Sequence, residues 1–217
     1  MFVQGRGYVG LRLHRHLTRG RSARKPRGLH LVSSGCIRDR VLLGERPAET
    51  TGRPAAGHWE GDLIVGSASG SAVVTLVERT TRFVVLVQLP NGHSALALRD
   101  ALIDAPNVLP IQLRRLLTWD QGTEMARHVE ITKATGVPIF FCDPHSPWQR
   151  GSNENMNGLL EWCPKGTDLN IHSDRHLLDV ATELNERPRK TLGRRTPADL
   201  LSELLSKTGR VPVASTP

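Results

Sequence analysis

Short apolar runs and amphipathic stretches alternate along the chain from residue 57 onward. Three runs rich in β-branched and other apolar residues, at 58–66, 72–78 and 82–89, predict strands. The segment Pro90-Asn91-Gly92 ends the third run, because proline and glycine favour turns. The folded part of the chain is therefore expected to begin with a three-strand meander.

A helical period follows these strands. Leu96, Leu98, Leu102 and Ile103 predict a helix over residues 94–104. The later apolar runs and periodic stretches predict a strand at 113–119, a helix at 122–135 closed by Gly136, a strand at 137–142, and helices at about 152–162, 174–186 and 197–205. This order predicts an α/β fold with a mixed sheet flanked by helices.

Residues 1–56 have a different character from the rest of the chain. They hold 12 of the 29 Lys and Arg residues and 3 of the 21 Asp and Glu residues, which is a net charge of +9, while the whole chain carries +8. Much Gly, Pro, Arg and Ser without sustained periodicity predicts a linker or an extended arm. We therefore divide the chain into a basic arm at 1–56, a core at 57–205 with a C-terminal helical segment, and a flexible tail at 206–217.

A sequence pI of about 10.2 favours a polyanionic partner, and the arm is the part that would bind it. A solvated tail without a role is the alternative. The residues of the arm expected to contact DNA are Arg15, Arg19, Arg21, Arg24, Lys25 and Arg27.

Several functional classes fit the sequence poorly. Three widely spaced cysteines do not form a disulfide framework, which favours a reducing cytosol, and no apolar run approaches the ~18 residues that span a bilayer. Cys142 and His145 lack a second ligand pair with zinc spacing. His58 and Glu60 resemble the His-x-Glu of deaminases, but no Pro-Cys-x-x-Cys follows. His128 is expected at the surface.

Three acidic residues stand where such a fold can bring them together. Asp62 lies within the first strand, Asp120 directly follows the strand at 113–119, and Glu154 lies near the start of a helix, with 33 residues between it and Asp120. Oxygen donors of this kind suit Mg²⁺ or Mn²⁺, and two such ions can drive phosphodiester chemistry. The alternative is that all three are ordinary solvated acids.

Five ordered motifs resemble the IS-thirty family of bacterial insertion-sequence transposases. They are Gly-His-Trp-Glu-Gly-Asp at 57–62, Thr-Trp-Asp-Gln-Gly-Thr-Glu-Met at 118–125, Asp-Pro-His-Ser-Pro-Trp-Gln-Arg-Gly-Ser-Asn-Glu-Asn at 143–155, Pro-Lys-Gly-Thr-Asp-Leu at 164–169, and Asn-Glu-Arg-Pro-Arg-Lys-Thr-Leu-Gly at 185–193. The resemblance runs from about residue 40 to 201.

The resemblance implies an RNase H-like (retroviral-integrase-like) fold in which Asp62, Asp120 and Glu154 form a DDE triad. The implied reaction is Mg²⁺-dependent hydrolysis at element ends followed by attack of the 3′-hydroxyl on target DNA, with Mn²⁺ able to substitute. It further implies a homo-oligomer on DNA, without membrane contact, in the bacterial cytoplasm at the nucleoid. Arg150 and Lys165, which lie within the motifs, are expected to contact DNA.

The chain departs from the family pattern in ways that leave alternatives open. The family begins with a helix-turn-helix region that this chain is expected to lack, as an N-terminally truncated copy. Glu161 stands where the family has arginine, one residue is missing before Pro164, and we expect Glu161 to weaken a phosphate contact. A catalytically inactive DNA-binding remnant is therefore the main alternative to an active transposase, and a ribonuclease of the same fold is a third hypothesis.

Overall fold

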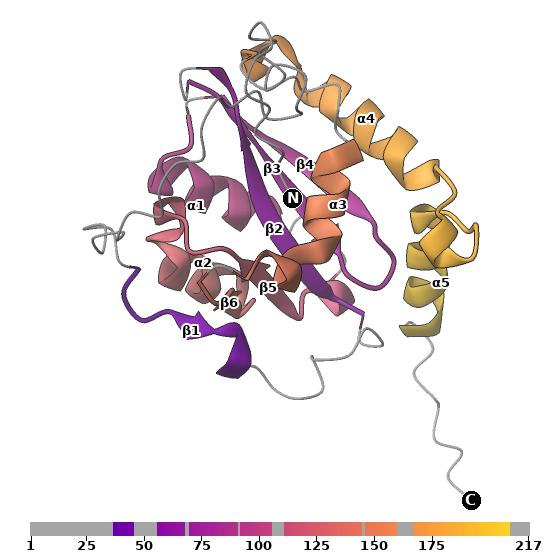
Figure 1. Cartoon of the computed structure of the whole chain (residues 1–217), viewed down its shortest axis with the longest axis horizontal. Helices are drawn as coiled ribbons and strands as arrows, with labels where there is room; N and C mark the ends of the chain where they lie inside the picture. Colours follow the sequence, from indigo (N-terminus) through magenta and orange to yellow (C-terminus); the bar gives the residue numbers. More distant parts are fainter. Residues whose placement is uncertain are drawn as a thin grey trace, which may run out of the picture. The chain divides into compact units, whose positions relative to one another are not determined.

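The structure is a computed structural model that describes residues 37–45, 56–67, 70–90, 92–105, 111–144, 146–159 and 167–208. Within these residues the chain forms one six-stranded mixed sheet with helices on both faces (Figure 1). No helix in the described ranges is long and apolar enough to cross a membrane.

The sheet combines an antiparallel meander with a parallel half. Its strands, in spatial order, are β1 (Val41–Leu42), β6 (Ile139–Phe141), β5 (Leu116–Trp119), β2 (His58–Val65), β3 (Ala72–Glu78) and β4 (Val84–Leu89). Strands β2, β3 and β4 pair antiparallel, whereas β2, β5, β6 and β1 pair parallel. The predicted three-strand meander and mixed sheet are confirmed.

Alternate residues of β2 and β3 face the two helical layers, because successive side chains of a strand point to opposite faces. Trp59, Leu76 and Trp119 join a core cluster with α1 (Ala95–Asp104) and α2 (His128–Thr135). On the other face, Val77 and Met156 join a cluster with α3 (Gly151–Leu159) and α4 (Asp174–Glu186). Helix α5 (Pro197–Thr208) follows α4.

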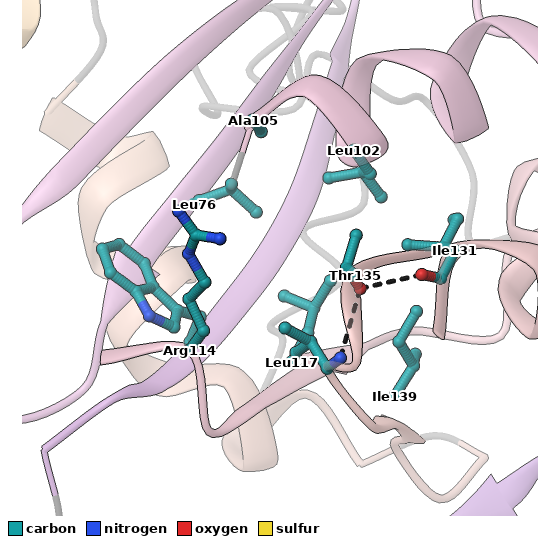
Figure 2. A pocket seen from close by; sticks show the side chains of 10 residues that line it. Leu76, Leu102, Ala105, Arg114, Leu117, Ile131, Thr135 and Ile139 are labelled. Atoms are coloured by element: carbon teal, nitrogen blue, oxygen red, sulfur yellow. Dashed lines mark hydrogen bonds between the residues drawn. The ribbon is translucent and has the colours of Figure 1, made fainter. Parts of the chain in front are cut away.

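The first layer encloses a small apolar pocket of about 40 Å³ between α1, α2 and the sheet (Figure 2). Leu76, Leu102 and Ile131 are among the side chains that line it. Arg114 and Thr135 are the polar side chains that line it, and the Thr135 hydroxyl is already paired, because it donates to the Ile131 carbonyl at 2.8 Å and accepts from the Val137 amide at 3.2 Å. The pocket is therefore a packing gap rather than a polar binding site.

Residues 37–45 are the main departure from the predicted arm. They contribute β1 to the sheet, through parallel pairing of Val41 with Phe140 and Leu42 with Phe141, and the short 3₁₀ turn Leu43–Glu45. Ile37 and Leu43 are buried. This segment belongs to the core because its apolar residues complete the exposed edge of β6, a long-range pairing that local periodicity does not report.

The expectation that His128 lies at the surface is also wrong. Its ring is 5% exposed and packs edge-on against Phe141, with 5.0 Å between ring centroids. One ring nitrogen lies 3.2 Å from the Met125 carbonyl and the other 3.3 Å from the Asp39 carbonyl. A backbone carbonyl lies beside each ring nitrogen, one of them in the segment that precedes β1, so either tautomer of the buried imidazole can donate a hydrogen bond to the backbone.

Other predicted boundaries shift by a few residues. The helix expected at 122–135 divides into a 3₁₀ turn at Thr123–Met125 and α2, while the strand expected at 113–119 begins only at Leu116. Helix α5 continues to Thr208, three residues into the predicted tail. The remainder of the arm and tail lies outside the described residues.

Candidate catalytic carboxylate site

Asp62 and Asp120 stand side by side on neighbouring parallel strands. In the register of β2 with β5, Glu60 is opposite Thr118, and the same offset brings Asp62 level with Asp120 immediately after β5 ends. Asp62 shares a face of β2 with Glu60, the face on which α3 packs, because side chains two residues apart point the same way. The sheet thus brings together the first two predicted site residues.

One guanidinium group joins the two carboxylates. Arg150 Nη1 lies 3.0 Å from Asp62 Oδ1, and Arg150 Nη2 lies 3.3 Å from Asp120 Oδ2. Nη1 also donates to the Gly61 carbonyl at 3.1 Å. The Arg150 side chain is only 11% exposed, whereas those of Asp62 and Asp120 are 23% and 41% exposed. The two carboxylates are therefore accessible from solvent, while the Arg150 guanidinium binds them from the buried side of the site.

The charges around Arg150 govern its protonation. Burial is the largest single influence and lowers the pKa of the guanidinium, but attraction from Asp62 and Asp120 together outweighs it, so the pKa is raised. Arg150 is thus a permanent cation at this position. The expected DNA contact of Arg150 remains a prediction, but in this structure the guanidinium binds the carboxylates.

Further hydrogen bonds fix the orientation of each aspartate. Asp62 accepts from its neighbour's amide, Leu63 N–H, at 3.0 Å on Oδ1 and from Asn157 Nδ2 at 2.9 Å on Oδ2. Asp120 accepts from the Gly122 amide at 3.0 Å on Oδ1. These contacts hold both carboxylates in place without covering them.

Glu154 is the fourth residue of helix α3. It follows Asn153, which is fully buried against β2 and β3, and precedes by three residues Asn157, which contacts Asp62. Positions three apart are neighbours on a helix surface. Helix α3 is thus bonded to β2 on both sides of Glu154 in the sequence, while the Glu154 side chain lies outside the described part of the structure, and its place in the site stays a prediction.

Gly61 separates Glu60 from Asp62 for a steric reason. On the opposite face of β2, a Cβ atom at Gly61 would lie 2.0 Å from the ring of Trp119. Only glycine allows the indole to lie flat across the strand at this point. The Trp119 side chain, itself completely buried, thereby fixes β5 against β2 directly beside the two aspartates.

A hollow of about 280 Å³ opens beside Asp120 and Arg150. Its far wall is formed by Cys142 and Asp143, which follow β6. Burial raises the pKa of the Cys142 thiol to about 11, so this sulfur is a neutral thiol rather than a nucleophile at ordinary pH.

The donor set of this site fits a hard divalent cation. Asp62 and Asp120 supply carboxylate oxygens, and the guanidinium that already bridges them shows that their geometry accommodates a shared positive charge. Among the described side chains, which do not include that of Glu154, no three His, Cys, Asp or Glu residues gather as a metal site. The expected third ligand, Glu154, stays a prediction.

Two features of the site escape sequence reasoning. The motifs that contain Glu60 assign it no role, although it lies two residues before Asp62 in the same strand, and this spacing is the signal that places both side chains on one face. The ion pairs of Arg150 with Asp62 and Asp120 join residues 88 and 30 positions apart and leave no local trace. Arg15, Arg19, Arg21, Arg24, Lys25, Arg27, Glu161 and Lys165 lie outside the described residues.

The fold defines the class of protein to which this core is similar. The catalytic core domain of BIV integrase superposes with a TM-score of 0.52 at 16% identity, covering 72% of this chain and all of that one. A chain from the structure of a simian T-cell lymphotropic virus intasome in complex with the PP2A regulatory subunit B56 gamma gives a TM-score of 0.54 at 15% identity, covering 74% of this chain and 56% of that one. The predicted RNase H-like, retroviral-integrase-like fold is confirmed.

Sequence comparison narrows this class. Residues 53–147 match the integrase core domain family. The chain is 46% identical over 98% of its length to the transposase of insertion sequence element IS1086 from Cupriavidus metallidurans, of which it spans 63%. It is also 46% identical over 76% of its length to the transposase InsI of IS30A from Escherichia coli, of which it spans 43%. The family resemblance carried by the motifs is thus confirmed: over most of its length this chain is similar to transposases of this type, and it carries a match to the integrase core domain.

Proposed function

We propose that this chain is the catalytic part of a DNA transposase, which cuts at the ends of a mobile element and joins them to target DNA. The observation that carries the proposal is the single guanidinium shared by Asp62 and Asp120, which supports treating the pair as one cation-binding site. Its support is the similarity to transposases over almost the whole chain. No comparison favours the inactive remnant.

Mg²⁺ is the proposed cofactor, with Mn²⁺ as a substitute, and Asp62, Asp120 and Glu154 are its proposed ligands. When bound, such an ion activates a water or a 3′-hydroxyl and stabilises the leaving oxygen of the phosphodiester. The chain's own hydrogen bonds to Asp62, from Leu63 and Asn157, keep that carboxylate oriented toward the site. Preorganisation of this kind lowers the cost of assembling the site on the substrate.

Arg150 has a second part in this proposal. Its planar fork suits a phosphate as well as it suits two carboxylates. Once the two aspartates bind the proposed cation, the Arg150 guanidinium is free to turn toward a phosphate of bound DNA. The residue thereby serves as a counter-ion in the metal-free protein and as a phosphate contact in the complex.

The proposed partners are the element ends and target DNA, bound by a homo-oligomer in the bacterial cytoplasm at the nucleoid. The basic arm at 1–56 and Lys165 would supply charge attraction to the phosphates. An oligomer is proposed because the solved relative of this fold from simian T-cell lymphotropic virus is part of an intasome. Binding through the arm should fall steeply with salt as counterions are released.

Asp120→Asn tests the proposal, because an amide of the same shape supplies no anionic ligand. With a pre-cut DNA end and Mg²⁺, strand transfer should fall by roughly a hundredfold or more, as loss of one essential electrostatic group commonly does. Asp100→Asn is the matched control, since Asp100 also pairs with an arginine, Arg99, but does so on the exposed surface of α1. Near-normal Mg²⁺-dependent nicking by Asp120→Asn would refute the mechanism.

A further inference from the structure

A third carboxylate lies on the same face of β2 as Asp62. Glu60 precedes Asp62 by two residues, and its side chain is 3% exposed. A carboxylate so deeply buried is costly unless ionic or hydrogen-bonding partners compensate for its lost hydration. The partners of Glu60 therefore indicate what it does.

Glu60 accepts hydrogen bonds from the first turn of α3. Its Oε2 accepts from the backbone amides of Ser152 at 2.9 Å and Asn153 at 3.1 Å. The first amides of a helix have no acceptor within the helix and carry its partial positive charge. Glu60 thus caps helix α3, which begins at Gly151, 91 residues after Glu60 in the sequence.

The other oxygen of the carboxylate is held by an ion pair. Arg79 Nε lies 3.0 Å from Glu60 Oε1, with the arginine side chain 16% exposed. Arg79 directly follows β3, the strand that pairs with β2. With one oxygen held by Arg79 and the other by α3, the carboxylate cannot rotate without losing one of its partners.

Asn153 strengthens the same junction. Its side-chain amide donates to the Glu60 carbonyl at 2.9 Å and to the Thr75 carbonyl at 3.1 Å. The Thr75 hydroxyl lies 3.0 Å from Asn153 Oδ1, to which it can donate. Asn153, which precedes Glu154, is therefore bonded through both its backbone amide and its side chain to Glu60, which lies two residues before Asp62.

We propose that Glu60 is a positioning residue, which fixes α3 and with it Glu154 against the strand that carries Asp62. The inference rests on the proposed function, in which Asp62, Asp120 and Glu154 bind the cation. Shortening or neutralising Glu60 would release the first turn of α3. The third ligand would then no longer be held at the distance that the other two require.

Glu60→Asp tests this role, because aspartate keeps the negative charge and its attraction for a cation but is one methylene too short to reach both partners. Mn²⁺ binding to the full chain, measured by isothermal titration and without DNA, should weaken about tenfold or more, as is common when a partner that orients a metal ligand is lost. The measurement is made well below the unfolding temperature of each variant, so that a loss of stability alone leaves the dissociation constant unchanged.

Glu78→Asp is the matched control. Glu78 is also fully buried, and it accepts from the backbone amides of Gly57, Thr80 and Thr81 at 3.1, 2.9 and 2.6 Å. It lies opposite Trp59 in the register, on the other face of the sheet. This change should lower the unfolding temperature while leaving the Mn²⁺ dissociation constant within about twofold, since no ligand depends on Glu78.

The outcomes separate the inference from the function on which it rests. If Asp62→Asn and Glu154→Gln fail to weaken Mn²⁺ binding, the proposed function is wrong. If they weaken it but Glu60→Asp binds as tightly as the natural chain, Glu60 is a structural residue only and the inference is overturned. Should Glu60→Asp not fold, the isosteric Glu60→Gln replaces it, and unchanged Mn²⁺ affinity in that variant overturns the inference equally.

Discussion

Arg150→Met should make the metal-free protein less stable but bind Mn²⁺ more tightly. A divalent cation bound by Asp62 and Asp120, as proposed, would have to displace the guanidinium that joins them. Methionine has a similar length and fills the buried space with an apolar chain. The variant therefore removes the competing cation with little change in packing.

The magnitude follows from the two contacts. At 3.0 and 3.3 Å, each charge pair attracts by about 5 kcal/mol at an effective dielectric constant of about 20. Burying the guanidinium offsets much of this, and the solvent around Asp120, which is 41% exposed, screens the rest. A net of about 1–2 kcal/mol is reasonable for the two contacts. Since 1.4 kcal/mol is tenfold, Mn²⁺ should bind roughly 5- to 30-fold more tightly to Arg150→Met.

Isothermal titration of the full chain with Mn²⁺ measures this change, and thermal unfolding with and without Mn²⁺ provides a second readout. Arg150→Lys is the control for charge: an ammonium can bind one aspartate but not both, so this variant should fall between the other two. If Arg150→Met binds Mn²⁺ no more tightly than the natural chain, the guanidinium does not compete for the site. Binding of DNA should change in the opposite direction, with the salt slope smaller by about one unit.

Two further predictions concern the body of the fold. Val137→Ile adds one methylene at the wall of the 40 Å³ pocket and should raise the free energy of unfolding, measured by urea titration, by about 0.8 kcal/mol. The control is Val129→Ile, at a residue that is 38% exposed, which should change the free energy of unfolding by less than about 0.3 kcal/mol. An equal effect of both substitutions would show that the added methylene does not fill the pocket. Because burial raises the pKa of Cys142 to about 11, only about one thiol in a thousand is ionised at pH 8, and the thiolate accumulates only as the pH rises toward that value. Site-resolved mass spectrometry should thus find Cys142 unmodified by iodoacetamide at pH 8 in the folded chain but modified in urea, and rapid modification of the folded chain at pH 8 would contradict the inferred burial.

Local periodicity predicted the elements whose residues decide their own structure. Strand β3 and helix α4 have the bounds expected from the sequence, 72–78 and 174–186, because each has a continuous pattern with clear ends. Strand β1 could not be predicted in this way. Two residues make no periodic pattern, and Val41 and Leu42 are extended only because Phe140 and Phe141 offer them an edge.

In the candidate site, too, some features could be predicted from the local sequence and others depend on long-range contacts. Asp62 and Asp120 could be paired in advance because one lies in a strand, the other directly after a strand, and parallel neighbours bring such positions level. The ion pairs of Arg150 and the cap supplied by Glu60 depend on how a loop and a helix return to the sheet. No spacing in the sequence encodes that return, because these contacts join residues between 30 and 92 positions apart.

Capping of α3 by the buried Glu60 carboxylate has a use beyond stability, for which a capping residue next to the helix would suffice. A serine or aspartate just before α3 would satisfy the same amides but leave the helix free to slide or tilt on the sheet. Glu60 satisfies them from the strand, so the helix is stable only in one position, with Asn153 against Thr75 and Asn157 against Asp62. The proposed catalytic site, with ligands from two strands and a helix, would need that coupling, because an error of about 1 Å in one ligand is enough to weaken such a site. The stability of α3 and the geometry of the carboxylates therefore depend on the same hydrogen bonds.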